Sequence, residues 1–119
     1  MTPARSLYIH VPFCTRKCAY CDFYSVPAGN DRAARYLWAL ERHLRRSIDD
    51  GVLDPSSIDT LYIGGGTPSV LSPTQWESLA RTLGQTLQFA AHYEFTVECN
   101  PESVTGRHLD IWHALGVNR

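Results

Sequence analysis

The chain alternates short apolar runs with longer amphipathic stretches. The apolar runs predict β-strands at residues 7–11, 60–63 and 93–98, because they are rich in β-branched and aromatic residues. Between and after these runs, apolar residues recur at helical spacing. Strands that alternate with helices are typical of repeated βα units, so the sequence predicts an α/β fold with a parallel sheet.

The first predicted helix follows residues 27–29, with Asn30 or Asp31 as its cap and Gly51 beyond its end. Helical spacing also marks the residues of its expected face, with a glutamate at the edge of the stripe. These residues are Ala34, Leu37, Trp38, Glu41, Leu44 and Ile48.

A second predicted helix has Ser72 as its cap and Pro73 at its first position. Its expected apolar face consists of Trp76, Leu79, Ala80, Leu83 and Leu87. A third predicted helix ends before Gly116 and carries Leu109, Trp112 and Leu115. All three tryptophans, Trp38, Trp76 and Trp112, fall at helical positions, and we expect them in the core between helices and sheet.

Length and charge narrow the class of protein. With 119 residues the chain is long enough for one domain, and residues 117–119 resemble the start of a fourth strand. We therefore expect residues 1–119 to be the N-terminal part of a longer, incomplete domain. The 11 basic and 12 acidic side chains nearly balance, which argues against nucleic acid as a partner. Because the run at 7–11 is too short for a signal peptide or a membrane span, we expect a cytoplasmic protein without membrane insertion.

Three cysteines provide the strongest chemical signal. Cys14, Cys18 and Cys21 are spaced C-x₃-C-x₂-C directly after the first predicted strand. A structural zinc site takes four protein ligands, whereas a four-iron cluster with three thiolates leaves one iron open for a small molecule. The spacing favours such a cluster over three buried thiols or a small zinc-binding module. Cys99 lies far away in the sequence, and we expect it to be a packed thiol rather than a ligand.

Two further motifs follow the second and third predicted strands. Gly64, Gly65 and Gly66 form a run that fits neither a phosphate loop nor a dinucleotide fingerprint, so it is either a tight turn or a ligand cradle. Glu98 is either a solvated charge or a carboxylate that binds a ribose diol. Because parallel strands end at the same edge of a sheet, the ligand interpretation is favoured for both. His10 is expected to be satisfied by a local hydrogen bond.

Four motifs in the same order give the chain a family resemblance. They are LYIHVPFC at 7–14 with CAYCDF at 18–23, YIGGGTPS at 62–69, ECNP at 98–101 and LGVNR at 115–119. With these motifs the chain resembles the radical S-adenosylmethionine enzymes related to oxygen-independent coproporphyrinogen III oxidase, and more closely the branch of haem chaperones. The resemblance implies the N-terminal part of a partial (β/α)₆ TIM-type barrel, with about three βα units.

The resemblance also implies roles for individual residues. Cys14, Cys18 and Cys21 would hold a [4Fe-4S] cluster. Tyr8 and Tyr20 would flank S-adenosylmethionine. Its methionyl and adenosyl parts and its ribose would be bound by Gly65, Gly66, Thr67 and Glu98.

The resemblance leaves two functions open. The true oxidases, as we align them, carry a further cysteine where this chain has Phe23, which favours the haem chaperone over the oxidase of porphyrin biosynthesis. Haem or a porphyrinogen, S-adenosylmethionine and an electron donor such as flavodoxin or ferredoxin are the implied partners. The residues that would bind haem or substrate in relatives are absent from this sequence.

Overall fold

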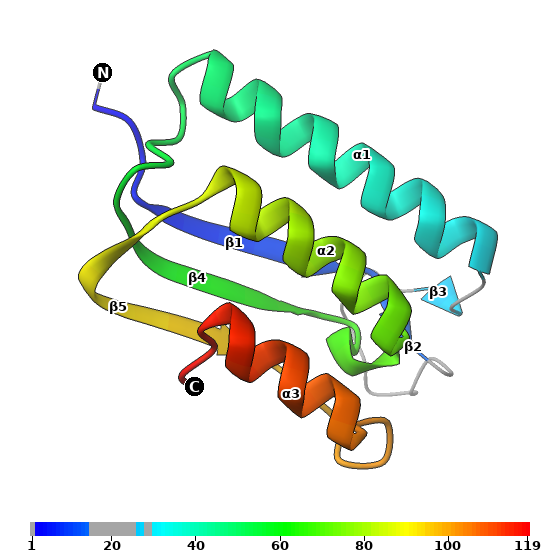
Figure 1. Cartoon of the computed structure of the whole chain (residues 1–119). Helices are drawn as coiled ribbons and strands as arrows, with labels where there is room; N and C mark the ends of the chain where they lie inside the picture. The colour runs from blue at the N-terminus through cyan, green and yellow to red at the C-terminus, as the bar shows by residue number, and fades with distance from the viewer. Residues whose placement is uncertain (1, 15–25, 28–29) are drawn as a thin grey trace.

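The structure is a computed structural model that describes residues 2–14, 26–27 and 30–119. Its elements are β1 (Ser6–Val11), β2 (Phe13–Cys14), β3 (Val26–Pro27), α1 (Asn30–Asp49), β4 (Ile58–Gly65), the 3₁₀ helix η1 (Pro68–Val70), α2 (Pro73–Thr86), β5 (Phe89–Val97) and α3 (Gly106–Leu115). A three-stranded parallel sheet has the order β1-β4-β5, and β2 pairs with β3 in a second parallel sheet. The predicted α/β fold with parallel strands is confirmed (Figure 1).

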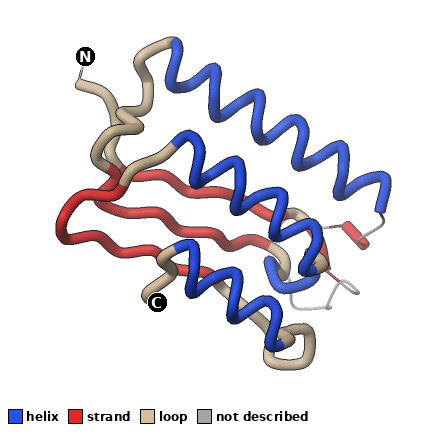
Figure 2. The backbone as a smooth tube through the Cα atoms, viewed as in Figure 1, coloured by secondary structure: helices blue, strands red, loops and turns tan. Residues whose placement is uncertain are grey.

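All three helices lie on the same face of the sheet, and no helix of the described residues covers the other face (Figure 2). Successive side chains of a strand point to opposite faces. The register pairs Tyr8 with Tyr62 and Tyr62 with Thr96, so these three residues form one row on the open face. The open face therefore carries polar and aromatic side chains, as a surface that meets ligand or solvent would.

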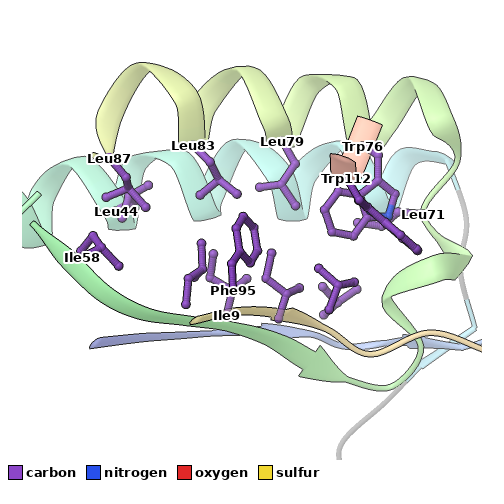
Figure 3. Close-up of a cluster of buried hydrophobic side chains, with 14 of the residues drawn as sticks. Ile9, Leu44, Ile58, Leu71, Trp76, Leu79, Leu83, Leu87, Phe95 and Trp112 are labelled. Carbon is purple, nitrogen blue, oxygen red and sulfur yellow. The ribbon is translucent and has the colours of Figure 1, made fainter. Parts of the chain in front are cut away.

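The hydrophobic core fills the space between the sheet and the helices (Figure 3). Phe95 of β5 and Trp76 of α2 have no exposed surface there. Trp76 packs edge to face against Trp112, with ring centroids 5.4 Å apart, and its indole nitrogen donates to the carbonyl oxygen of Pro68 at 2.9 Å. The prediction that Trp76 and Trp112 lie in the core is confirmed.

The prediction for Trp38 is wrong. Its side chain is 61% exposed, with the guanidinium of Arg42 4.6 Å above the ring. It lines a groove of about 370 Å³ between α1 and α2. The buried stripe of α1 is rotated toward the preceding residue, so that Ala33 and Leu44 are buried while Ala34 is exposed.

The second and third helices begin with capping boxes. Ser72 accepts a hydrogen bond from the backbone of Gln75, and the Gln75 side chain accepts one from the backbone of Ser72. The predicted cap and Pro73 start of α2 are thus confirmed. α3 ends at Leu115 and is capped by Gly116, whose φ of 102° is the left-handed conformation that glycine favours. Leu109 faces away from the core and is 56% exposed, because α3 buries His108 and Trp112 instead.

All three strands of the main sheet begin earlier than the sequence predicts, β1 by one residue at Ser6. β4 spans Ile58–Gly65 and β5 spans Phe89–Val97, so that Glu98 lies just beyond its strand. Past α3, the backbone nitrogens of Asn118 and Arg119 donate to the Phe95 carbonyl at the edge of β5. Among the described residues, no helix is long and apolar enough to cross a membrane.

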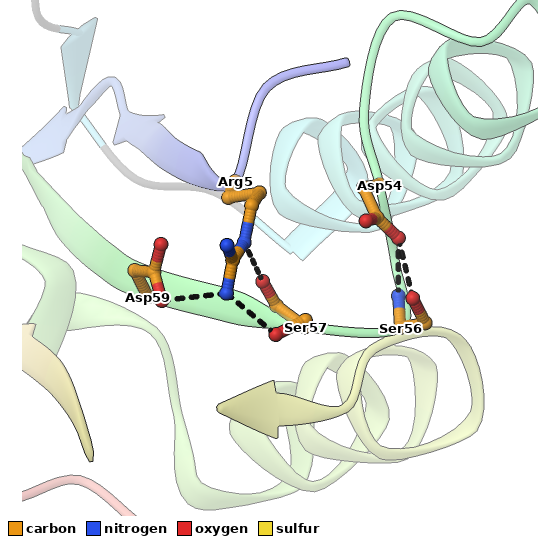
Figure 4. A network of polar contacts seen from close by, with 5 residues as sticks. All are labelled: Arg5, Asp54, Ser56, Ser57 and Asp59. Carbon is orange, nitrogen blue, oxygen red and sulfur yellow. Dashed lines mark hydrogen bonds and ion pairs between the residues drawn. The ribbon is translucent and has the colours of Figure 1, made fainter. Parts of the chain in front are cut away.

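A polar network fastens the opposite, amino-terminal ends of β1 and β4 (Figure 4). Arg5 donates to the Ser57 carbonyl at 2.9 Å and to the Ser57 hydroxyl at 2.7 Å, and forms an ion pair with Asp59 at 3.1 Å. Asp54 accepts from the hydroxyl and the backbone nitrogen of Ser56. The hydrogen bond from the Ser56 hydroxyl is the main cause that lowers the pKa of the Asp54 carboxyl, and the one from the Ser56 backbone nitrogen comes second. The network sets where β4 begins beside β1.

A glycine turn carries the chain from β4 across the end of β1. The Gly66 nitrogen donates to the Val11 carbonyl at 2.8 Å, and the Thr67 nitrogen donates to the Phe13 carbonyl at 2.6 Å. Gly65 has a φ of 117°, and a Cβ there would lie 2.7 Å from the Val11 oxygen. A Cβ on Gly66 would collide with the Phe13 carbonyl oxygen. The backbones approach too closely for any side chain, which explains both glycines without a ligand.

Replacing Gly66 by Ala should lower the free energy of unfolding by about 1–3 kcal/mol, because the new methyl group meets backbone atoms that cannot rotate away. Gly84→Ala is the matched control. Gly84 is exposed in α2 with open space around it, so alanine should stabilise the helix by about 0.5–1 kcal/mol. Urea denaturation measures both. Equal stability of the Gly66→Ala protein and the parent would contradict the close approach.

Candidate functional site

The carboxyl ends of the three parallel strands bring the sequence motifs to one edge of the sheet, here called the rim. In the register, Val11 at the end of β1 pairs with Gly65 at the end of β4. The Glu98 nitrogen, just past β5, donates to the Ile63 carbonyl at 3.0 Å. Cys14 ends β2, three residues after Val11, the last residue of β1. The rim therefore gathers one predicted metal ligand, the glycine turn and the candidate ribose-binding carboxylate.

A small pocket of about 100 Å³ opens at the rim. It is lined by Gly66, Thr67, Pro68, Glu98, Cys99 and Asn100. The buried Ser69 hydroxyl ties its two walls together, because it accepts from the Asn100 nitrogen at 3.1 Å and bonds the Ser103 hydroxyl at 2.5 Å. The pocket joins residues of two motifs that are about thirty positions apart in the sequence.

Aromatic side chains continue the site along the open face of the sheet. Tyr8 and Tyr62 lie in adjacent strands with ring centroids 5.9 Å apart. Tyr62 donates from its hydroxyl to Oε1 of Glu98 at 2.5 Å, and the Tyr8 hydroxyl bonds Nδ1 of His10 at 3.0 Å. The expected local hydrogen bond of His10 is confirmed. Tyr8 is 54% exposed, which leaves its ring accessible to a ligand.

Glu98 changes the titration of both tyrosines. Its hydrogen bond is the main cause that raises the pKa of the Tyr62 phenol above the usual 10.0. Desolvation, followed by the negative charge of Glu98, raises the pKa of the Tyr8 phenol. Both phenols therefore keep their protons at neutral pH and act as hydrogen-bond donors.

Tyr36 of α1 contacts both the end of β1 and the start of β2. Its hydroxyl donates to the His10 carbonyl at 2.5 Å, and its ring packs edge to face against Phe13 at 5.4 Å. Burial is the main cause that raises the pKa of this phenol, so it remains a donor. Tyr36 thus holds β1 and β2 against the helix layer next to the predicted metal ligand.

The structure places some of the predicted site residues and leaves others outside the described ranges. Cys14 is buried at the end of β2, 8% exposed. Tyr20, Cys18, Cys21 and Phe23 lie in the segment 15–25, outside the described residues. Among the described residues, no group of three potential ligands forms a metal site. The three-cysteine ligand set therefore remains a prediction.

The remaining predicted residues all lie at the rim or on the open face. Gly65, Gly66, Thr67 and Glu98 are neighbours there, and Tyr8 lies farther along β1. Cys99 is exposed and lines the rim pocket, so the expectation of a packed thiol is wrong. The strand ends before Cys99, and its side chain consequently leaves the core layer.

Sequence reasoning missed one residue of the site, Tyr62, and gave Gly64 no role apart from the rest of the glycine run. A Cβ on Gly64 would lie 2.8 Å from the Tyr62 ring and 2.9 Å from Oε1 of Glu98. Strand alternation could have placed Tyr62 on the face of Tyr8, because both lie in predicted strands. The partnership of Tyr62 with Glu98 needs the register of β4 and β5, which spacing alone does not provide.

Comparison with known proteins finds relatives that match nearly the whole chain. It is 38% identical to the heme chaperone HemW of Escherichia coli (strain K12) over 98% of its length, and 36% identical to that of Bacillus subtilis (strain 168) over 97%. The chain spans about a third of these relatives, 31% and 30% of their lengths. The structure matches coproporphyrinogen III oxidase (HemN) from Escherichia coli, described as a radical SAM enzyme.

That match has a TM-score of 0.82 and 32% identity over 96% of this chain and 26% of the oxidase. The fold expected from the resemblance, part of a radical SAM barrel, is thereby confirmed. A sequence model of the radical SAM superfamily matches residues 8–119, nearly the whole chain. The chain therefore belongs to the radical SAM superfamily.

Proposed function

We propose that this protein binds a [4Fe-4S] cluster and S-adenosylmethionine at the rim, and that it is a haem chaperone. One observation carries the cofactor proposal: a C-x₃-C-x₂-C motif follows β1 in a chain of the radical SAM superfamily. The motif starts at Cys14, and the structure puts Cys14 at the same rim as Glu98 and the glycine turn. An iron–sulfur cluster and a nucleoside ligand thus have their candidate residues on one edge.

The chemistry of the described residues fits these two groups. Cys14 supplies a soft thiolate of the kind that iron–sulfur clusters require. The rim pocket offers a carboxylate and a side-chain amide, from Glu98 and Asn100, which are hydrogen-bonding partners for a ribose and an amino acid moiety. Tyr8 adds an exposed ring on the open face, next to Tyr62.

Each candidate site residue then has a proposed role. Cys14, Cys18 and Cys21 hold the cluster, and Glu98 accepts hydrogen bonds from the ribose diol. Gly65, Gly66 and Thr67 receive the methionyl and adenosyl parts, while Tyr8 and Tyr20 flank the ligand. When bound, the cluster and S-adenosylmethionine supply one-electron reductive cleavage of a sulfonium bond. The protein holds the cluster and S-adenosylmethionine in position and excludes water from them.

The chaperone proposal rests on the curated relatives and on Phe23. Two bacterial relatives with 38% and 36% identity are named heme chaperone HemW. The residue at position 23 is phenylalanine, where we expect the oxidases to carry a further cysteine. The similarity of the fold to HemN favours coproporphyrinogen III oxidation as the second candidate.

Three further parts of the proposal follow from the same reasoning. The hydrogen bonds of Asn118 and Arg119 to β5 support a fourth strand at this edge, within a longer barrel domain. A flavodoxin or ferredoxin would supply the electron. The protein would act in the cytoplasm on haem or, in the second candidate function, on a porphyrinogen.

Cys14→Ala should abolish cluster assembly, because the cluster loses one of three thiolates. Iron and acid-labile sulfide analysis, with the visible charge-transfer absorbance, measures the cluster after anaerobic reconstitution. Cys99→Ala is the matched control and should retain full iron and sulfide. Retention of the cluster in the Cys14→Ala protein would refute the ligand set, and zinc without sulfide in the parent would establish the zinc module.

Glu98→Ala should weaken the binding of S-adenosylmethionine about tenfold while iron content stays unchanged, because hydrogen bonds to a charged acceptor are lost. Isothermal calorimetry on anaerobically reconstituted protein measures the affinity. Glu102→Ala removes a nearby exposed carboxylate that does not line the rim pocket and should bind normally. Unchanged affinity in the Glu98→Ala protein would remove Glu98 from the site.

The two candidate functions are separated by an anaerobic comparison of full-length protein. As a chaperone it should bind haem and pass it to an apo-haemoprotein, detected by the Soret band of the acceptor. It should not decarboxylate coproporphyrinogen III when S-adenosylmethionine and a reductant are present. Turnover of coproporphyrinogen without haem transfer would reverse the order of the two candidates.

A further inference from the structure

Tyr62 and Glu98 form a close pair across two strands. The Tyr62 hydroxyl donates to Oε1 of Glu98 at 2.5 Å, although 36 residues separate them in the sequence. Tyr62 pairs with Thr96 in the register, and Glu98 follows Thr96 by two residues on the same face. The parallel pairing of β4 and β5 therefore brings phenol and carboxylate together on the open face of the sheet.

Gly64 provides the space in which this pair lies. A Cβ added there would meet Cε1 of Tyr62 at 2.8 Å, and Oε1 and Cδ of Glu98 at 2.9 and 3.0 Å. All three atoms belong to side chains, whereas the nearest atoms at Gly66 belong to the backbone of Phe13. The first glycine of the run thus accommodates the Tyr62–Glu98 pair, while Gly66 accommodates the crossing of two chain segments.

The hydrogen bond restricts a carboxylate that is otherwise unconstrained. Glu98 is exposed, and among the described residues only Tyr62 donates to its side chain. A free glutamate samples several rotamers, and a ligand that selects one of them pays that ordering cost on binding. The phenol holds Oε1, so that Oε2 keeps its lone pairs for donors of a ligand.

We propose that Tyr62 is a positioning residue, which orients the Glu98 carboxylate toward the vicinal diol of a ribose. The inference rests on the proposed function, because it takes Glu98 as the ribose-binding group. Tyr62 acts through Glu98 and does not bind the diol itself. Its ring lies next to the ring of Tyr8 on the adjacent strand, with centroids 5.9 Å apart, which limits the directions in which the phenol can turn.

The test compares ligands with and without the diol. Calorimetry on anaerobically reconstituted protein measures affinity for S-adenosylhomocysteine and for its 2′,3′-dideoxy analogue, in the parent and in the Tyr62→Phe, Glu98→Ala and doubly substituted proteins. Tyr62→Phe should bind S-adenosylhomocysteine about fivefold more weakly, as expected for one lost hydrogen bond. It should bind the dideoxy analogue as the parent does. In the Glu98→Ala background, where the acceptor of the phenol is gone, Tyr62→Phe should have no further effect.

Two variants make the test specific. Tyr93→Phe removes a phenol of β5 that donates to the Gly116 carbonyl at 2.8 Å, away from the rim, and should leave both affinities unchanged. Gly64→Ala should lower the preference for the diol as Tyr62→Phe does, because the three atoms nearest to the new methyl group belong to the side chains of the pair. Circular dichroism and urea denaturation confirm that each variant is folded.

The outcomes separate this inference from the proposed function. If the parent prefers the diol and Tyr62→Phe keeps that preference in full, the positioning role is overturned while the ribose site stands. If Tyr62→Phe weakens binding equally in the Glu98→Ala background, Tyr62 acts independently of Glu98 and the inference is wrong. If the parent does not bind S-adenosylhomocysteine, or shows no preference for the diol, the ribose assignment of Glu98 fails first.

Discussion

The arrangement of the rim depends on the close passage of the glycine turn over the end of β1. Two backbone hydrogen bonds, from Gly66 to Val11 and from Thr67 to Phe13, fasten the turn to the segment that leads into Cys14. At this contact the backbones lie too close together for a Cβ on Gly65 or Gly66. The same contact sets the path of the chain after β4 and the position of Phe13, the residue before Cys14. A residue larger than glycine would move both at once.

The two faces of the sheet carry side chains with different roles. Apolar side chains such as Ile63 and Phe95 pack against the helices and supply the stability, while Tyr62, Thr96 and Glu98 face the open side. The two-residue period of a strand makes this division possible within a few positions. A change on the open face can thus alter ligand binding with little effect on the core.

The sequence predicted most of the architecture because strand and helix signals are local. The cap at Ser72, the helix end before Gly116 and the parallel direction of the strands needed no tertiary information. The buried face of α1 did, since the adjacent apolar residues Leu37 and Trp38 allow two stripes, and packing selects the one with Ala33. The contact of Tyr62 with Glu98 likewise depends on strand register rather than on spacing.

The hydrogen bond from the Trp76 indole to Pro68 has an optical consequence. Pro68 begins the 3₁₀ helix behind the glycine turn, and Trp76 is fully shielded from water. Its fluorescence, together with that of the buried Trp112 beside it, should therefore be emitted at short wavelength and respond when the turn shifts. Trp38, in contact with solvent, contributes a separate long-wavelength signal that such a shift leaves constant. The chain carries both an intrinsic reporter and its internal reference.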